Sequence, residues 1–161
     1  TTVAELWTVE VATGKAARLY AGDAVQPAWS PDGTRIAYWA NTGGQRDIWT
    51  IPAAGGAPEA VTSDAATDWS PAWSPDGRWL YYVAERKILR VAVRPSGPRL
   101  EVGEEETIAE GNFVAMSPAF AGTKRERFLV ALGPAVEPPV ELRVIMNFQH
   151  EIEEKLAQEH R

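Results

Sequence analysis

The chain has 161 residues, no cysteine and a formal net charge of -6, with 16 lysine and arginine residues against 22 aspartate and glutamate residues. This acidic balance argues against electrostatic capture of nucleic acid, so we expect no nucleic-acid partner. The absence of cysteine excludes disulfide bonds and thiolate metal sites, and no segment has the apolar length of a membrane-spanning helix.

The sequence begins with two short predicted strands. The first is Glu5–Val9, and the second follows a turn at Gly14. The same pattern recurs further along the chain, where Asp47–Ile51 is followed by a glycine-rich turn and by Glu59–Thr62. We therefore interpret residues 1–22 as part of a structural unit whose complete copies follow.

A heptapeptide, Pro-Ala-Trp-Ser-Pro-Asp-Gly, occurs at residues 27–33 and again at 71–77, a step of 44 residues. Each copy leads into an alternating run, at 34–39 and at 78–83, and therefore predicts a hairpin. Proline suits such a turn because its ring fixes φ, aspartate bonds the local backbone, and glycine accepts a positive φ. We expect these turn residues to be structural, although matched aspartates also suit a carboxylate pair: Ser30, Pro31, Asp32 and Gly33, and Ser74, Pro75, Asp76 and Gly77.

A third, degenerate copy is indicated by Ser117-Pro118, which lies 43 residues after Ser74-Pro75 and lacks the Asp-Gly. Strand patterns follow at 127–131 and 140–146. Repeats of 40 to 45 residues with short strands and turn signals are typical of β-propellers. We predict an all-β propeller segment of about three to three and a half four-stranded antiparallel blades over residues 1–147. The predicted units are a partial blade at 1–22, blades at 23–66 and 67–110, and an incomplete blade at 111–147.

Residues 148–161 are predicted to form a short C-terminal amphipathic helix. Phe148, Ile152 and Leu156 recur at four-residue steps, and Glu151 and Lys155 form a favourable pair. We expect this helix to fold back onto a blade, with docking of a partner as the alternative.

The tryptophans divide into two groups. Trp39 and Trp69 are less well placed for packing than the other five, and Trp69 is the aromatic residue that we would test first for binding. The other five fall at repeat positions and are expected to pack between blades, with stacking on a ligand as the alternative: Trp7, Trp29, Trp49, Trp73 and Trp79.

These motifs resemble the TolB-like propeller repeat, also called the PD40 or WD40-like repeat. Its consensus has an aromatic-Ser-Pro-Asp-Gly turn, an apolar strand and a later Ile-Tyr/Trp strand, and the resemblance extends from Glu5 to about Ala131. It implies that the chain is the C-terminal portion of a larger bacterial propeller, because closed propellers need about four to eight blades. The alternative is a self-contained small domain.

We find no catalytic motif and predict that the chain is not itself an enzyme. It lacks the Gly-x-Ser-x-Gly sequence of α/β-hydrolases and the His-Arg-Asp sequence of protein kinases. Its two histidines, His150 and His160, have a spacing unsuited to a metal pair on one helical face. No metal site or cofactor is expected, apart from a possible calcium ion held by Asp23 and Asp68.

The resemblance implies a non-catalytic scaffold that binds a protein, a peptide or a small ligand, with the remaining blades of a parent propeller as further partners. An extracytoplasmic location, periplasmic or membrane-tethered, is favoured over a cytoplasmic one. Propellers bind ligands where the loops that feed their inner strands converge, which makes Asp23, Asp68, Trp69 and Asn112 the candidate binding residues. The alternative function is an accessory or regulatory propeller of a prolyl-oligopeptidase-like peptidase or a serine/threonine kinase.

Overall fold

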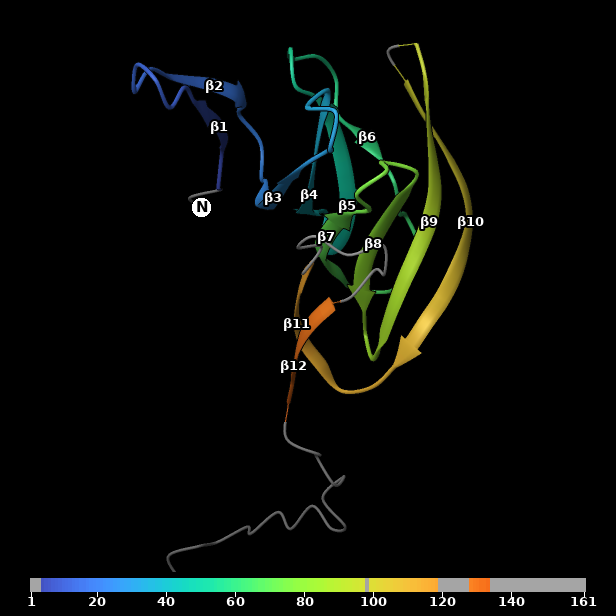
Figure 1. The fold of residues 1–161 in the computed structure, drawn as a ribbon. Coiled ribbons are helices and arrows are strands. Elements are labelled where there is room, and N and C mark those ends of the chain that lie inside the picture. The colour runs from blue at the N-terminus through green and yellow to red at the C-terminus, as the bar shows by residue number, and fades with distance from the viewer. Residues whose placement is uncertain (1–3, 98, 119–127, 134–161) are drawn as a thin grey trace, which may run out of the picture.

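The computed structural model describes residues 4–97, 99–118 and 128–133, and these residues form β-strands connected by turns and loops (Figure 1). The predicted strand at 140–146 and the predicted helix at 148–161 lie outside the described residues. No helix in the described part of the chain is long and apolar enough to cross a membrane. The strands are β1 (Leu6–Val9), β2 (Ala16–Tyr20), β3 (Val25–Trp29), β4 (Arg35–Thr42), β5 (Gln45–Pro52), β6 (Glu59–Ala60), β7 (Asp68–Trp73), β8 (Trp79–Ala84), β9 (Lys87–Ser96), β10 (Arg99–Glu110), β11 (Phe113–Pro118) and β12 (Phe128–Leu132).

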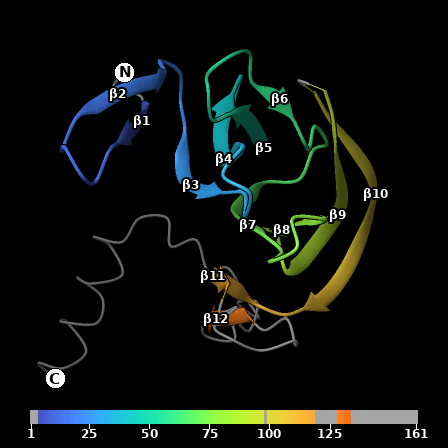
Figure 2. The same cartoon turned by 45° about the horizontal axis from the view of Figure 1, so that its top comes forward.

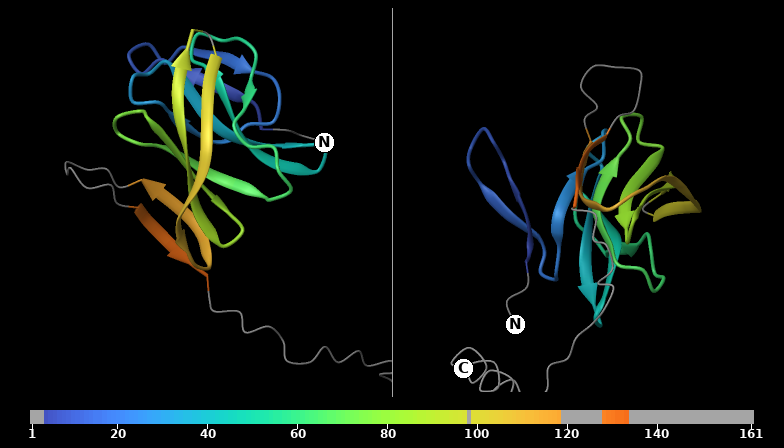
Figure 3. Two further views of the ribbon diagram at one scale, coloured as in Figure 1. Left: turned by 90° about the vertical axis from the view of Figure 1, so that its right-hand side faces the viewer. Right: turned by 90° about the horizontal axis from the view of Figure 1, so that it is seen from below.

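The strands form four antiparallel sheets. Two are four-stranded, with the orders β3-β4-β5-β6 and β7-β8-β9-β10, and we call these the complete blades. Two are two-stranded, β1-β2 and β11-β12, and we call these the half blades. Figure 2 shows the four sheets side by side in an arc, with the half blades at its two ends, and Figure 3 shows the long β9–β10 hairpin on the outer side. The predicted all-β propeller architecture is confirmed.

The two Ser-Pro-Asp-Gly turns share one hydrogen-bond pattern. In the first, the Ser30 hydroxyl donates to Asp32 Oδ1 at 2.6 Å, and the Thr34 amide donates to the same oxygen at 3.0 Å. In the second, the Ser74 hydroxyl donates to Asp76 Oδ1 at 2.7 Å. Both aspartates are therefore held within their own turns rather than paired with each other.

The chemistry of these turns explains their Asp-Gly pairs. Hydrogen bonds from Ser30 and Ser74 lower the pKa of Asp32 and of Asp76, because they favour the charged carboxylate. The glycine that follows has φ 69° in the first turn and 71° in the second, a backbone conformation in which a Cβ is strained.

Three apolar clusters form the core, and each lies between two neighbouring sheets. The first contains Leu6 and Ile36, from a half blade and a complete blade. The second joins the complete blades through residues such as Ile48 and Leu80, and the third joins β8 and β9 to Phe113 of β11. The stability of each blade therefore depends on the blade beside it, as expected for a repeat fold.

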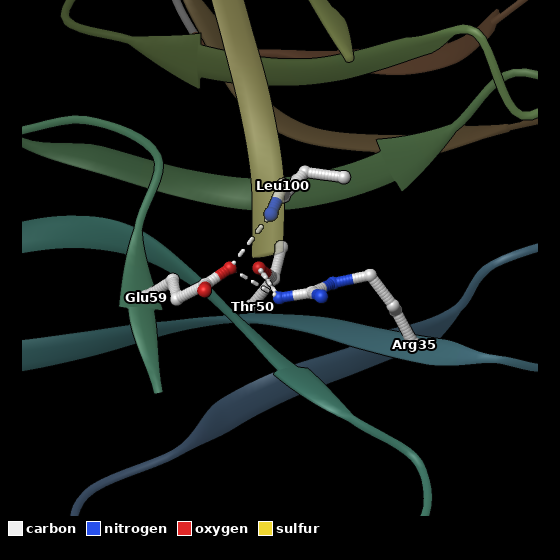
Figure 4. A network of polar contacts seen from close by, with 4 residues as sticks. All are labelled: Arg35, Thr50, Glu59 and Leu100. Carbon is white, nitrogen blue, oxygen red and sulfur yellow. Dashed lines mark hydrogen bonds and ion pairs between the residues drawn. The ribbon is translucent and has the colours of Figure 1, made fainter. Parts of the chain in front are cut away.

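Polar contacts add to this packing between the complete blades. The Arg35 guanidinium forms an ion pair with Glu59 at 2.7 Å and donates to the Thr50 hydroxyl at 3.0 Å. Glu59 also accepts a hydrogen bond at 3.0 Å from the amide of Leu100, which belongs to β10 of the neighbouring blade (Figure 4). The Trp73 indole donates to the Ala28 carbonyl at 3.1 Å, again from one complete blade to the other.

Candidate binding site at the loop end

The two ends of the blades differ in the segments that they present. One end carries the loops that lead into β3, β7 and β11, together with the β4–β5 connection. Two of these segments are joined directly, because the Asn41 amide at the end of β4 donates to Asp23 Oδ2 in the loop before β3 at 2.8 Å. We call this the loop end, and we call the opposite end, which carries the two Ser-Pro-Asp-Gly turns, the turn end.

Asp23 lies at the loop end, but its carboxylate is already used by the fold. One oxygen accepts from the Asn41 amide at 2.8 Å, and the other accepts from the Ala4 amide at 3.4 Å. Asp23 therefore joins the half blade that contains β1 to the β4–β5 connection. This structural role competes with the predicted role in ligand binding.

Asp68 begins β7 and is 1% exposed. Neither of its carboxylate oxygens has a hydrogen bond of standard geometry. Burial raises the pKa of Asp68 to about 6, and the Thr62 hydroxyl opposes this rise. The carboxylates of Asp64 and Asp47 raise it further. Asp68 is therefore a buried carboxyl group near other carboxylates, and its pKa of about 6 lies well above that of an exposed aspartate.

The calcium site predicted from Asp23 and Asp68 stays a prediction. Within residues 4–97, 99–118 and 128–133, no group of three or more histidine, cysteine, aspartate or glutamate side chains is arranged to hold a metal ion. Asp23 already accepts two backbone hydrogen bonds, whereas Asp68 has unused acceptor capacity.

Trp69 and Asn112 also lie at the loop end. Trp69 is half-buried and packs against the third apolar cluster, which includes Val83 and Phe113. Asn112 is half-buried in the connection between β10 and β11, and its carbonyl accepts from the Gly133 amide at 2.8 Å. Asp68 and Trp69 are adjacent in one strand, while Asp23 and Asn112 precede two other inner strands, so the four predicted residues come from three sheets.

Trp39, which the sequence marked as less well placed for packing, forms a second arrangement at this end with Gln26 and Arg46, which sequence reasoning did not select. Gln26 Oε1 accepts from the Trp39 indole at 2.8 Å and from the Ser70 amide of the neighbouring blade at 3.2 Å. The Arg46 guanidinium lies 4.4 Å from the centre of the Trp39 ring. Gln26 is exposed, and Trp39 and Arg46 are half-buried. We call these three residues the Gln26–Trp39–Arg46 cluster.

The backbone has an unusual conformation at Gln26 of this cluster and at Ser70, to which Gln26 is hydrogen-bonded. Gln26 has φ 51° and Ser70 has φ 55°, and each precedes the proline of a heptapeptide copy. The pairing register of β3 and of β7 shifts at the same place. Such left-handed conformations of non-glycine residues cost about 1–3 kcal/mol and concentrate at functional sites. The sequence signal was the matched position before Pro27 and Pro71, but it does not reveal the sign of φ.

A groove of about 790 Å³ lies at the opposite, turn end. It is lined by both Ser-Pro-Asp-Gly turns and by the β9–β10 hairpin, and Trp79 is one of its walls. The Arg90 guanidinium lies 4.0 Å from the centre of the Trp79 ring. Each complete blade therefore carries one arginine–tryptophan stack, one at the loop end and one at the turn end.

Comparisons with known proteins identify the fold. The family model of the TolB beta propeller domain, PD40, matches residues 2–90. The putative TolB of Agrobacterium tumefaciens is similar in structure, with a TM-score of 0.51 and 23% identity over 69% of this chain and 44% of that chain. TolB of Acinetobacter baumannii is similar with a TM-score of 0.51 and 18% identity, over 71% of this chain and 39% of that chain.

A third similar structure is the tricorn protease, with a TM-score of 0.55 and 17% identity over 71% of this chain and 16% of that chain. At these identities the likeness shows the fold alone. The chain spans less than half the length of the two TolB structures. No curated protein matches the chain. The predicted resemblance to the TolB-like repeat is confirmed.

Proposed function

Because the chain belongs to the TolB beta propeller (PD40) family, we propose that it is a non-catalytic scaffold that binds a peptide or protein segment at the loop end. The Gln26–Trp39–Arg46 cluster carries this proposal. It combines an exposed amide, an aromatic ring and a cation at a point where two blades meet.

The chemistry of the cluster favours a ligand with a carboxylate. Arg46 has no ion pair within the described residues, and its Nε is a buried donor without a partner. A guanidinium in this state is suited to a carboxylate, which it can bind through two parallel hydrogen bonds. The chain carries a net charge of -6, which repels a run of acidic residues. A peptide with one free carboxylate, such as a C-terminus, therefore fits better than a polyacidic segment.

The test uses two fluorescently labelled pools of random heptapeptides, one with free C-terminal carboxylates and one with amidated C-termini. We expect fluorescence anisotropy to show binding of the first pool, with at least about tenfold weaker binding of the amidated pool, since a charge-assisted pair contributes about 1.5–3 kcal/mol. Arg46→Ala and Trp39→Ala are expected to remove the difference between the pools.

The matched control is the second arginine–tryptophan stack. Arg90→Ala and Trp79→Ala remove the same chemistry at the turn end and are expected to leave binding unchanged. Loss of binding in these two variants, with retention in the Arg46 and Trp39 variants, would overturn the proposal in favour of the groove. Absence of binding to both pools would also overturn it.

A second candidate function is an accessory propeller of an enzyme, either a peptidase or a kinase. The structural likeness to the tricorn protease is compatible with this role. The coding sequence around this chain distinguishes the two candidates. A hydrolase or kinase core in the same reading frame supports the accessory role, whereas further repeats behind a secretory leader support the binding scaffold and the extracytoplasmic location that we propose with it.

A further inference from the structure

The two complete blades differ most in their outer strands. The fourth strand of the first blade is β6, with 2 residues, whereas the fourth strand of the second blade is β10, with 12 residues. Strands in globular proteins average about 5–6 residues. Figure 3 shows β10 on the outer side of its blade, and residues 101–108 are all exposed. The outer edge of β10 faces away from the ring because of its place in the blade, whatever the number of blades.

This outer edge carries backbone groups that β9 does not use. Among the described strands, β10 pairs with β9 alone. The Val93 amide of β9 donates to the Arg78 carbonyl at 2.8 Å, so it points away from β10. Opposite residues in an antiparallel pair direct their N–H groups either both toward each other or both outward. The amide of Val102, which is opposite Val93, therefore points to the outer edge.

One amide on the same edge already binds an acceptor from another blade. Leu100 lies two residues before Val102 and has the same orientation, and its amide donates to Glu59 Oε2 at 3.0 Å (Figure 4). This carboxylate oxygen lies where a carbonyl oxygen of an added strand would lie. The edge is thus able to donate to an outside acceptor, and Glu59 limits its free part to the residues that follow Leu100.

The charge of β10 decides which kind of strand can be added. β10 has one arginine and five glutamates, a net charge of -4, against -6 for the whole chain. Three of these glutamates are opposite cations of β9: Glu101 with Arg94, Glu106 with Arg90, and Glu110 with Lys87. A second basic strand on the outer edge can face the same glutamates. Two β10 edges would instead bring glutamates opposite glutamates, which is destabilising.

We propose that the outer edge of β10, over residues 101–110, binds an extended basic segment of a partner protein by strand addition. Main-chain hydrogen bonds supply the affinity in this mode, and side chains at alternate positions supply the selectivity. Two register shifts interrupt β10, so the partner pairs along runs of a few residues rather than along the whole edge. The glutamates exclude a second copy of this chain as the occupant. This proposal is independent of ligand binding at the loop end.

Labelled nonapeptides with blocked ends test the proposal by fluorescence anisotropy at low ionic strength. A peptide of alternating lysine and threonine is expected to bind, and the glutamate analogue to bind at least about tenfold more weakly, because opposite charges across strands attract and like charges repel. Two further lysine peptides carry N-methyl groups, one on the lysine amides and one on the threonine amides. Only one set of amides faces β10, so one of the two is expected to lose at least about tenfold in affinity. Equal affinity of all three lysine peptides, or no binding at all, would overturn the proposal.

Variants of Val102 locate the bound peptide. Val102→Pro removes the outward amide and keeps the pairing with β9, because proline is tolerated on an edge strand where its nitrogen faces solvent. It is expected to weaken binding of the lysine peptide at least about fivefold. Val102→Thr keeps the amide and is expected to bind as the parent chain does. Unchanged binding by a folded Val102→Pro variant would overturn the proposal.

A charge reversal on β10 gives a test that does not depend on proline. Glu104→Lys, at an exposed residue, is expected to weaken binding of the lysine peptide and to strengthen binding of the glutamate peptide. The matched control is Glu10→Lys, which makes the same change of net charge at an exposed residue between β1 and β2. It is expected to have a smaller effect on both peptides. Equal effects of the two reversals would overturn the proposal, because they would show attraction to the net charge of the chain alone.

Discussion

The complete blades and the half blades are built from the same repeat, but equivalent apolar side chains are buried to different extents in them. Leu80 in β8 is 0% exposed, whereas Val130, at the equivalent position of β12, is 39% exposed. The residues are similarly apolar, and the difference lies in the third strand, which β8 has and β12 lacks among the described residues. Burial in this fold therefore comes from the neighbouring strand and blade rather than from the residue type.

The strongest test of this comparison substitutes a leucine in each kind of blade. Leu80→Ala removes a fully buried side chain from the cluster between the complete blades and is expected to lower the free energy of unfolding by about 2–5 kcal/mol. Leu132→Ala, at a residue 64% exposed, is expected to change it by less than about 0.5 kcal/mol. Urea unfolding at low protein concentration measures both. Equal losses would show that the half blades are also buried in solution.

The polar contacts between the complete blades give a second, smaller test. Glu59→Gln removes the charge that faces the Arg35 guanidinium, whose side chain is 6% exposed, and is expected to cost about 1–3 kcal/mol. The control is Glu106→Gln, which removes the ion pair between Arg90 and a glutamate 55% exposed, and is expected to cost less than about 1 kcal/mol. Similar values in thermal or urea unfolding would contradict a specific role of Glu59 in joining the blades.

The smallest expected effect sharpens the comparison between the complete blades themselves. Asp68 is buried at the start of the second complete blade, whereas the equivalent residue of the first complete blade, 44 positions earlier, is Ala24. Because the pKa of Asp68 is raised from 3.8 to about 6, the folded state binds more protons than the unfolded state between these values. Protonated Asp68 therefore contributes stability that is fully present below about pH 4, and this contribution is lost as the pH rises through about 6 and the carboxyl group ionises.

Asp68→Asn removes this dependence. It is expected to stabilise the fold at pH 7 by roughly 1–2 kcal/mol after allowance for solvent screening, and to have little effect at pH 4. The measurement is the difference in unfolding free energy between variant and parent chain at the two pH values, which cancels the titration of other groups. A stabilisation that is equal at both pH values would show that desolvation of the charge is not its cause.

The repeated turns were accessible to sequence reasoning because their interactions are local. The Ser30 hydroxyl and the Asp32 carboxylate that it contacts are two residues apart, and the following glycine supplies the positive φ. The same heptapeptide therefore predicted the same hairpin twice. The number of strands in each complete blade followed from the strand signals after each hairpin, such as Asp47–Ile51 and Glu59–Thr62.

The candidate site was less accessible, because its contacts join distant segments. The sequence placed Asp68 near the loop end, but its burial and raised pKa depend on packing against the preceding blade. Within the Gln26–Trp39–Arg46 cluster, Gln26 and Arg46 were not selected, since Gln26 meets Ser70 only when two blades stack across a separation of 44 residues.

By itself, the amino-acid sequence determined the repeat, the turns and the membership of a propeller family, because these depend on residues close together in the chain. The tertiary structure decided which apolar residues are buried, and that the Asp68 carboxylate is buried without a hydrogen bond of standard geometry. Those properties depend on the sheet that lies alongside, and a strand such as β1 or β12 has the same local pattern whether or not a neighbour covers it.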